Sequence, residues 1–188
     1  MSPTDWAAMG TLHVEPALDR PELLAEPVAK ALAALDPTGA VTVGVAEIDP
    51  ELADTAAFCE AYGSPLDASA NCVVVAGRRS GEVRHAACLV LATTRADVNG
   101  LVRRHLDVRK ASFAPMDEAV KLTGMEFGGI TPLGLPTGWP LLLDPAVIAA
   151  PGVVVGSGLR RSKLVLPGAL LAQLPAAEVL DGLGRPVS

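Results

Sequence analysis

The sequence predicts an α+β domain with a mixed, mostly antiparallel and partly barrel-like β-sheet flanked by short helices. Half of the 188 residues are hydrophobic and only 19% are charged, which is typical of a globular core. Short strand patterns interleave with short helix patterns, and a tight hairpin over 71–92 joins two of the strands. Because no linker, repeat or low-complexity tract divides the chain, we expect a single domain spanning 1–188.

The first third of the chain should contain a helix, a strand and a second helix. Residues 19–22 combine a capping aspartate, a first-turn proline and a glutamate, which predicts an N-terminal helix over 19–36 that Pro37 stops. Valines alternate with small or polar residues over 41–45, as in a strand with one buried face. An Asp-Thr pair opens a short helix over 54–63, and its last residue is a helix-ending glycine.

The middle of the chain carries the clearest local patterns. We expect strands over 71–76 and 83–92 around a turn at 78–81, a helix capped by Thr94 and Asp97 and running to His105, a strand over 109–113, and a helix from Pro115 to Gly124.

The last third begins with an irregular loop. Residues 128–138 are too rich in glycine and proline for a regular element, so they should form a shaped loop. Strands should follow over 140–143, 153–156 and 163–166, then a helix over 167–173. These elements complete a core over 40–175, and a flexible tail is expected over 176–188.

The charge is divided unevenly along the chain. The net charge is −6, but residues 1–67 carry twelve acidic and two basic side chains, whereas residues 78–110 carry eight basic and three acidic ones. This asymmetry can steer a polyanion to one face, although solvated surface charge is the simpler alternative. Only six residues are aromatic, so base-stacking platforms of the RRM kind are not expected.

Several classes of function are disfavoured by missing patterns. No apolar run is long enough for a membrane span and no secretory signal is visible, so we expect a cytoplasmic protein without a membrane partner. The three cysteines have no CxxC spacing and should be buried free thiols. The histidines lack metal-ligand spacing, and neither a P-loop nor a dinucleotide fingerprint is present, so no metal or cofactor is expected. Ser157 does not lie in a G-x-S-x-G elbow.

The loop over 128–134 reads Gly-Gly-Ile-Thr-Pro-Leu-Gly and is the most informative motif. Adjacent glycines allow backbone N–H groups to converge on one point and allow a ligand to approach the main chain, as an oxyanion site requires. Thr131 adds a hydroxyl group. Taken alone, a glycine-rich pattern of this kind is more often an ordinary turn.

The wider segment 114–134 contains Leu-Thr-Gly followed, three residues later, by this loop. It resembles the signature of the YbaK-like aminoacyl-tRNA deacylases, the family that includes the editing domain of bacterial prolyl-tRNA synthetases. The segment 54–63 resembles the family's short helix, and 156–160 resembles its late glycine-rich basic turn. The resemblance covers about 40–175. It implies the family's α+β fold and hydrolysis of the ester of a mischarged tRNA.

The resemblance also implies roles for individual residues. The aminoacylated 3′ end of tRNA would be the substrate, an aminoacyl-tRNA synthetase is a candidate protein partner, and DNA is not expected. Catalysis would use Gly129 as oxyanion donor, together with Thr131 and Asn71. The substrate pocket would be formed by Gly128, Ile130, Pro132, Gly134, Gly156, Ser157, Gly158 and Lys163. Phosphates of the tRNA would meet Arg78, Arg79, Arg160 and Arg161.

One position departs from the family pattern. Many members carry a lysine at the start of the central strand, where this chain has Asn71. An asparagine can donate a hydrogen bond but brings no charge. Three alternatives follow: the substrate differs, another cation substitutes for the lysine, or hydrolysis is lost. Lys163 is the candidate substitute, and a chain without hydrolysis would be a non-catalytic module that binds a tRNA end or a protein.

Overall fold

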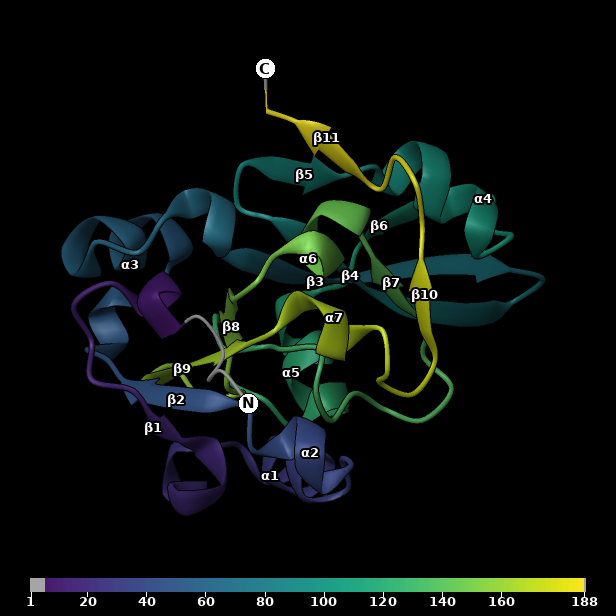
Figure 1. Cartoon of the computed structure of the whole chain (residues 1–188). Helices are drawn as coiled ribbons and strands as arrows, with labels where there is room; N and C mark the ends of the chain where they lie inside the picture. Colours follow the sequence, from purple (N-terminus) through teal and green to yellow (C-terminus); the bar gives the residue numbers. More distant parts are fainter. Residues whose placement is uncertain (1–5, 188) are drawn as a thin grey trace.

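The computed structural model describes residues 6–187, and a five-stranded sheet with the order β10-β7-β4-β3-β6 runs through its middle (Figure 1). Strand β3 pairs antiparallel with β4 and β6, whereas β7 lies parallel to β4 and β10. The strands are β3 (Ala70–Arg79), β4 (Glu82–Leu91), β6 (Ala111–Phe113), β7 (Leu141–Leu143) and β10 (Ala177–Val179).

A second sheet, with the order β1-β2-β9-β8, is antiparallel throughout. A single bridge between Ser69 and Val154 joins it to the start of β3. Its strands are β1 (Glu15–Pro16), β2 (Gly44–Glu47), β8 (Val153–Gly156) and β9 (Ser162–Leu166), and a separate pair is formed by β5 (Thr94–Ala96) and β11 (Gly184–Pro186). The predicted α+β class with mostly antiparallel pairing is confirmed.

The helices are short and lie around the sheets (Figure 1). They are α1 (Glu26–Ala33), α2 (Pro37–Ala40), α3 (Thr55–Tyr62), α4 (Arg103–His105), α5 (Met116–Thr123), α6 (Pro145–Ala149) and α7 (Gly168–Leu171). Single 3₁₀ turns lie at Trp6–Met9, Ala17–Asp19, Pro21–Leu23, Pro50–Leu52 and Leu66–Ala68, and a π turn at Val98–Val102. Within the described residues, no helix is long and apolar enough to cross a membrane.

Helices α3 and α5, which border the candidate active site described below, begin and end where the sequence predicts. Asp54 caps α3 by accepting a hydrogen bond from the N–H of Ala56 at 3.1 Å, and Gly63 ends it with φ +69°. Gly124 ends α5 in the same left-handed conformation, with φ +68°. Because glycine has no Cβ, it adopts this conformation without steric cost.

The predicted hairpin is also present. Strands β3 and β4 are paired from Ala70 opposite Leu91 to Arg79 opposite Glu82. The turn residues Ser80 and Gly81 have φ values of +52° and +86°, as in a two-residue turn whose twist matches that of the strands.

The helix predicted over 19–36 is wrong in its first half. Residues 21–23 form only a 3₁₀ turn, Ala25 is extended, and α1 begins at Glu26. Pro27 explains the difference, because it has no N–H to donate to the carbonyl of Leu23 and would interrupt a helix that began at Asp19.

The helix predicted from Thr94 is likewise displaced. Thr94 lies in β5, and Asp97 alone caps the following turn, accepting hydrogen bonds from the N–H groups of Gly100 and Leu101 at 3.0 Å each. An aspartate with two oxygens satisfies two of the free donors of a helix start, so the strand can continue up to it.

The tail predicted to be flexible beyond 175 is instead paired. Strand β10 lies parallel to β7, strand β11 lies antiparallel to β5, and Leu183 between them is fully buried. The weak hydrophobicity of this segment hid its strands, since edge strands need only one buried face.

Apolar side chains fill both faces of the central sheet. One cluster, which includes Leu89, Leu133 and Leu164, packs against α1 and the second sheet, and another, which includes Val75 and Val102, packs beneath the turn at 98–102. Cys59, Cys72 and Cys88 are free thiols; Cys59 and Cys88 are buried, as predicted, whereas Cys72 is half-buried. The start of β3, where the two sheets meet, is the part of the fold that positions the site.

Candidate active site

A cavity of about 590 Å³ lies along the first half of β3, between α3, α5, the loop at 127–130 and the ends of β8 and β9. This volume is typical of a small-molecule site. Its walls are mostly small or apolar, including Ala53, Ala56, Ala70, Val73, Val74 and Ala119. Its polar side chains are Asp54, Thr55, Asn71, Cys72 and Lys163.

Lys163 is the buried cation of the cavity. It lies on β9 with only 7% of its surface exposed, and its Nζ donates a hydrogen bond to the carbonyl of Ala53 at 2.8 Å. The same Nζ lies 5.5 Å from the centre of the Phe58 ring, within cation–π range. Burial lowers the pKa of Lys163 to about 8, although the nearby Asp54 carboxylate opposes part of this change. The ammonium retains donors for a ligand, since it has three.

Asn71 lines the same cavity and is the second residue of β3. Its amide oxygen accepts a hydrogen bond from the hydroxyl of Thr55 at 2.6 Å. This contact orients the side chain and leaves its two amide N–H donors for the cavity. Asn71 and Lys163, the two residues that the sequence linked through the missing family lysine, thus line one cavity.

Asp54 places a negative charge at the rim of the cavity. Its carboxylate caps α3 and is exposed to solvent. The cavity therefore carries one charged group of each sign, a buried ammonium and an exposed carboxylate.

The two glycine-rich bends lie side by side and are hydrogen-bonded together. The N–H of Gly158 donates to the carbonyl of Gly129 at 2.7 Å, and the N–H of Glu126 donates to the carbonyl of Gly158 at 2.8 Å. A Cβ on Gly156 would lie 2.3 Å from the carbonyl oxygen of Gly129. The glycines are needed because the two main chains touch.

The role predicted for Gly129 does not fit this geometry. Its N–H donates to the carbonyl of Glu126 at 2.9 Å, so it is already used and cannot also serve as an oxyanion donor. Thr131 is fully buried and does not line the cavity, and its hydroxyl has no partner within the described part of the chain.

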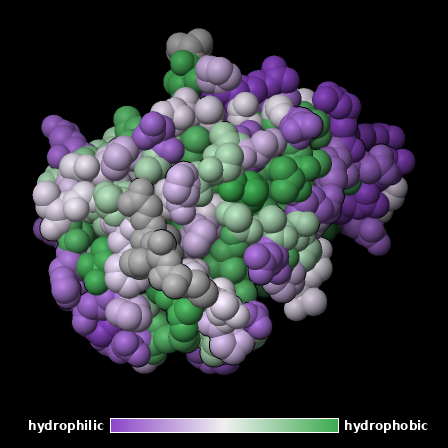
Figure 2. Space-filling model, viewed as in Figure 1, coloured by the Kyte–Doolittle hydropathy of each residue, from purple (hydrophilic) through white to green (hydrophobic). Residues whose placement is uncertain are grey.

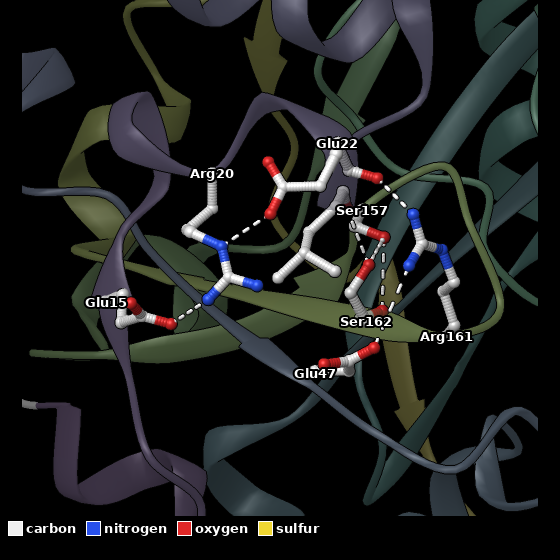
Figure 3. A network of polar contacts seen from close by, with 8 residues as sticks. Glu15, Arg20, Glu22, Glu47, Ser157, Arg161 and Ser162 are labelled. Carbon is white, nitrogen blue, oxygen red and sulfur yellow. Dashed lines mark hydrogen bonds and ion pairs between the residues drawn. The ribbon is translucent and has the colours of Figure 1, made fainter.

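The remaining predicted pocket residues divide into two groups. Gly128, Ile130 and Gly156 line the cavity. The other four, Pro132, Gly134, Ser157 and Gly158, do not line it. A Cβ on Gly134 would lie 2.4 Å from the carbonyl oxygen of Pro27 in α1, and a Cβ on Gly158 would lie 2.4 Å from the side chain of Ala25, just before α1. Ser157 bonds to the hydroxyl of Ser162 at 2.7 Å and is buried (Figure 3). These four residues support the bends.

The four predicted phosphate-binding arginines also divide. Arg160 donates to the carbonyls of Phe127 at 3.2 Å and Pro50 at 2.9 Å. Arg161 donates to the carbonyl of Glu22 and lies 3.7 Å from the carboxylate of Glu47 (Figure 3). Both guanidinium groups therefore hold the chain together.

Arg78 and Arg79 lie at the tip of the β3–β4 hairpin, in the hydrophilic end of the molecule (Figure 2). Arg79 is paired with Asp107. Arg78 is exposed and has no side-chain partner among the described residues. Of the four arginines, Arg78 is the one whose side chain is free to bind a phosphate.

The cysteine of the cavity is not activated as a nucleophile. Burial raises the pKa of the Cys72 thiol, which therefore stays protonated. Within residues 6–187, no group of three or more histidine, cysteine, aspartate or glutamate side chains is arranged to hold a metal ion.

Sequence reasoning did not identify several lining residues. Thr55 and Asp54 were recognised only as a helix start, and Phe113, Met116 and Phe127 were not considered for the site. The capping motif was the available signal for the first two.

The fold and this cavity define a class of α+β domain with a cavity of small-molecule size between the start of β3 and two glycine-rich bends. The model of one family, described as the aminoacyl-tRNA editing domain, matches residues 49–174. The chain therefore belongs to the aminoacyl-tRNA editing domain family.

Solved structures agree with this membership. A structure described as a candidate trans-editing enzyme for prolyl tRNA synthetase is 25% identical, with a TM-score of 0.69 over 86% of this chain and 99% of the other. A structure from work on grafting epitopes onto scaffold proteins has the same identity and TM-score, over 86% and 97%. The hypothetical protein APE2540, at 19% identity, shares the fold with a TM-score of 0.70 over 85% and 100%. A comparison with curated proteins gives no match.

Proposed function

We propose that this chain hydrolyses the ester bond between a mischarged amino acid and the 3′ end of its tRNA. The observation that carries the proposal is that Lys163 and Asp54 both line the cavity of a member of the editing family. An aminoacyl ester presents an ester carbonyl next to a positively charged α-amino group. The buried ammonium suits the carbonyl oxygen, and the carboxylate at the rim suits the α-amino group.

The chemistry requires little from the protein. Water adds to the ester carbon, the carbonyl oxygen becomes an oxyanion, and the intermediate expels the ribose oxygen, which takes up the proton that water loses. Lys163 and the amide N–H groups of Asn71 would stabilise the oxyanion, in the role that the sequence assigned to Gly129. Fixed donors of this kind contribute several kcal/mol each, about 3 kcal/mol in comparable hydrolases. A neighbouring hydroxyl of the substrate ribose can serve to orient the water.

The walls indicate a small amino acid. The side chains around the polar groups include Ala53, Ala56 and Ala70, and the main chain of Gly156 completes one side. A cavity of this kind accepts small side chains and excludes larger ones by steric overlap, which is how an editing site complements a synthetase.

The decisive experiment incubates the purified chain with a panel of mischarged tRNAs and follows release of the amino acid. A similar structure is described as a trans-editing enzyme for prolyl tRNA synthetase. The proline tRNA charged with a wrong amino acid is therefore tested first, with correctly charged tRNAs as the control. We expect rapid release of one small amino acid. No release from any member of the panel would contradict the proposal.

A second arm tests the assignment of Asp54. The same aminoacyl-tRNA with its α-amino group acetylated has no positive charge, so the contact with Asp54 is lost and hydrolysis should slow at least tenfold. Equal rates for the free and acetylated substrates would remove Asp54 from the site.

The alternative function, a non-catalytic module, is favoured by one observation, the asparagine at the position of the family lysine. In that case the wild type is inert, and Asn71→Lys creates activity. Release by the wild type, with no gain on Asn71→Lys, excludes this alternative.

A further inference from the structure

The mouth of the cavity carries two exposed phenylalanines. The chain has three phenylalanines. Phe58 is 1% exposed, whereas Phe113 is 62% and Phe127 54% exposed, and both of these line the cavity. Burying a phenylalanine side chain is worth roughly 1.5–3 kcal/mol to a folded protein. In a chain with so few aromatic residues, two exposed rings at one opening indicate a ligand that covers them.

Hydrogen bonds fix the main chain at both phenylalanines. Phe113 ends β6, opposite Val75, and the next residue, Ala114, donates its N–H to the carbonyl of Val74 at 2.9 Å. The carbonyl of Phe127 accepts a hydrogen bond from Arg160, which itself is tied to Pro50. Because an aromatic side chain has only two rotatable bonds, it binds a flat ligand at low entropic cost.

Lys163 and the two phenylalanines lie at different depths. Lys163 is almost fully buried, while Phe113 and Phe127 are more than half exposed. A ligand that places its reactive group next to Lys163 therefore has its next moiety at the mouth. In an aminoacyl-tRNA the ester is attached to the ribose of the terminal adenosine, so the moiety at the mouth is that ribose with its adenine base.

We propose that Phe113 and Phe127 form a stacking surface for the terminal adenine of tRNA. The inference rests on the proposed function and assigns a binding role to two residues outside the polar set. Stacking uses the π-face of a base and needs no ionisable group. It revises the expectation, drawn from aromatic content, that this chain does not use stacking.

The mutational test separates binding from chemistry. Phe113→Leu and Phe127→Leu keep an apolar side chain of similar size but lose the ring. We expect each to raise KM for the aminoacyl-tRNA by about fivefold to a hundredfold, the contribution of one stacked base, with kcat within about twofold. Phe113→Trp should restore KM. Leu122→Ala is the matched control, because Leu122 is an exposed apolar residue of α5, 44% exposed, that does not line the cavity.

A direct binding measurement does not depend on turnover. Fluorine-labelled phenylalanine gives three NMR signals, one for each ring. Adenosine 5′-monophosphate should shift the signals of Phe113 and Phe127 more than that of the buried Phe58, and ribose 5-phosphate should shift neither. Equal effects of the two compounds, or unchanged KM in both leucine variants, would overturn the inference.

The outcomes also distinguish the two proposals. If the wild type releases amino acids but the leucine variants behave like the wild type, the stacking surface is wrong and the deacylase function stands. If the wild type releases nothing, yet adenosine monophosphate shifts both exposed rings, the stacking surface stands and the catalytic proposal fails.

Discussion

The two sides of the cavity use their residues in different ways. On one side, the bends around Gly129 and Gly158 satisfy each other's backbone groups, at 2.7 and 2.8 Å. On the other side, Lys163 and Asn71 each make one hydrogen bond within the protein and retain donors that face the cavity. The glycine side gives the cavity its shape, and the side-chain side carries its polar groups.

This difference corrects a natural reading of glycine-rich motifs. Adjacent glycines allow main-chain amides to converge on a ligand, but they equally allow two main chains to touch. The hydrogen-bond partners decide between the two, and they are invisible in a sequence. The following predictions test whether the division between the two sides holds.

Replacing the buried cation should have the largest effect on activity. Lys163→Met keeps the length of the side chain but removes the ammonium, so kcat/KM should fall about a hundredfold to a thousandfold, as for the loss of one oxyanion donor. Because a buried charge is costly, the free energy of unfolding in urea should stay the same or rise. Full activity of Lys163→Met would show that the chemistry lies elsewhere.

Disturbing the glycine side should instead affect stability. Gly156→Ala would place a Cβ 2.3 Å from the carbonyl oxygen of Gly129, and since backbone cannot easily give way, unfolding should become easier by about 2–4 kcal/mol. Gly63→Ala is the control. It meets open space and carries only the cost of a positive φ, about 1 kcal/mol. Equal losses in the two variants would mean that the bends are not in tight contact.

The pH profile should report the same lysine. Its folded pKa is about 8, so kcat/KM, corrected for spontaneous ester hydrolysis, should be flat below about pH 8 and then fall about tenfold per pH unit. Stability changes in the opposite direction. Between pH 8 and 10.5 the unfolded lysine binds a proton that the folded one has lost, so the wild type should gain up to about 3 kcal/mol relative to Lys163→Met across this window. A kcat/KM profile that does not decline above pH 8 would exclude the charged form of Lys163 from catalysis.

The smallest effect is expected from the arginines. Arg78→Ala removes a free cation, so KM for tRNA should rise about threefold and the dependence of binding on salt should weaken. Arg161→Ala removes an engaged side chain and should mainly reduce stability. If Arg161→Ala instead weakens tRNA binding without loss of stability, the division between free and engaged arginines is wrong.

Local signals in the sequence were sufficient for much of the fold. The caps of α3 and α5, the β3–β4 hairpin and the irregular loop at 128–138 follow from residues within a few positions of one another. Errors arose where one residue overruled a plausible motif, as Pro27 did for the N-terminal helix, and where strands are defined by distant partners, as β10 and β11 are.

The site was predicted in part for the same reason. The glycine motif located the cavity, and the departure at Asn71 directed attention to Lys163. Other properties depend on tertiary contacts that form only in the folded chain. These are the hydrogen bond that occupies the Gly129 amide, the hydrogen bonds that hold Arg160, and the exposure of Phe113. No local pattern encodes such contacts.

The last two strands, β10 and β11, have a practical consequence for anyone who wishes to isolate the segment that the family model matches. The family match ends at residue 174, before β10 and β11. A chain cut there would uncover the hydrogen-bonding edge of β7, whose three leucines are buried in the intact molecule, and exposed apolar strand edges recruit other chains. Self-association of the shortened protein, rather than loss of its catalytic groups, would then limit its use.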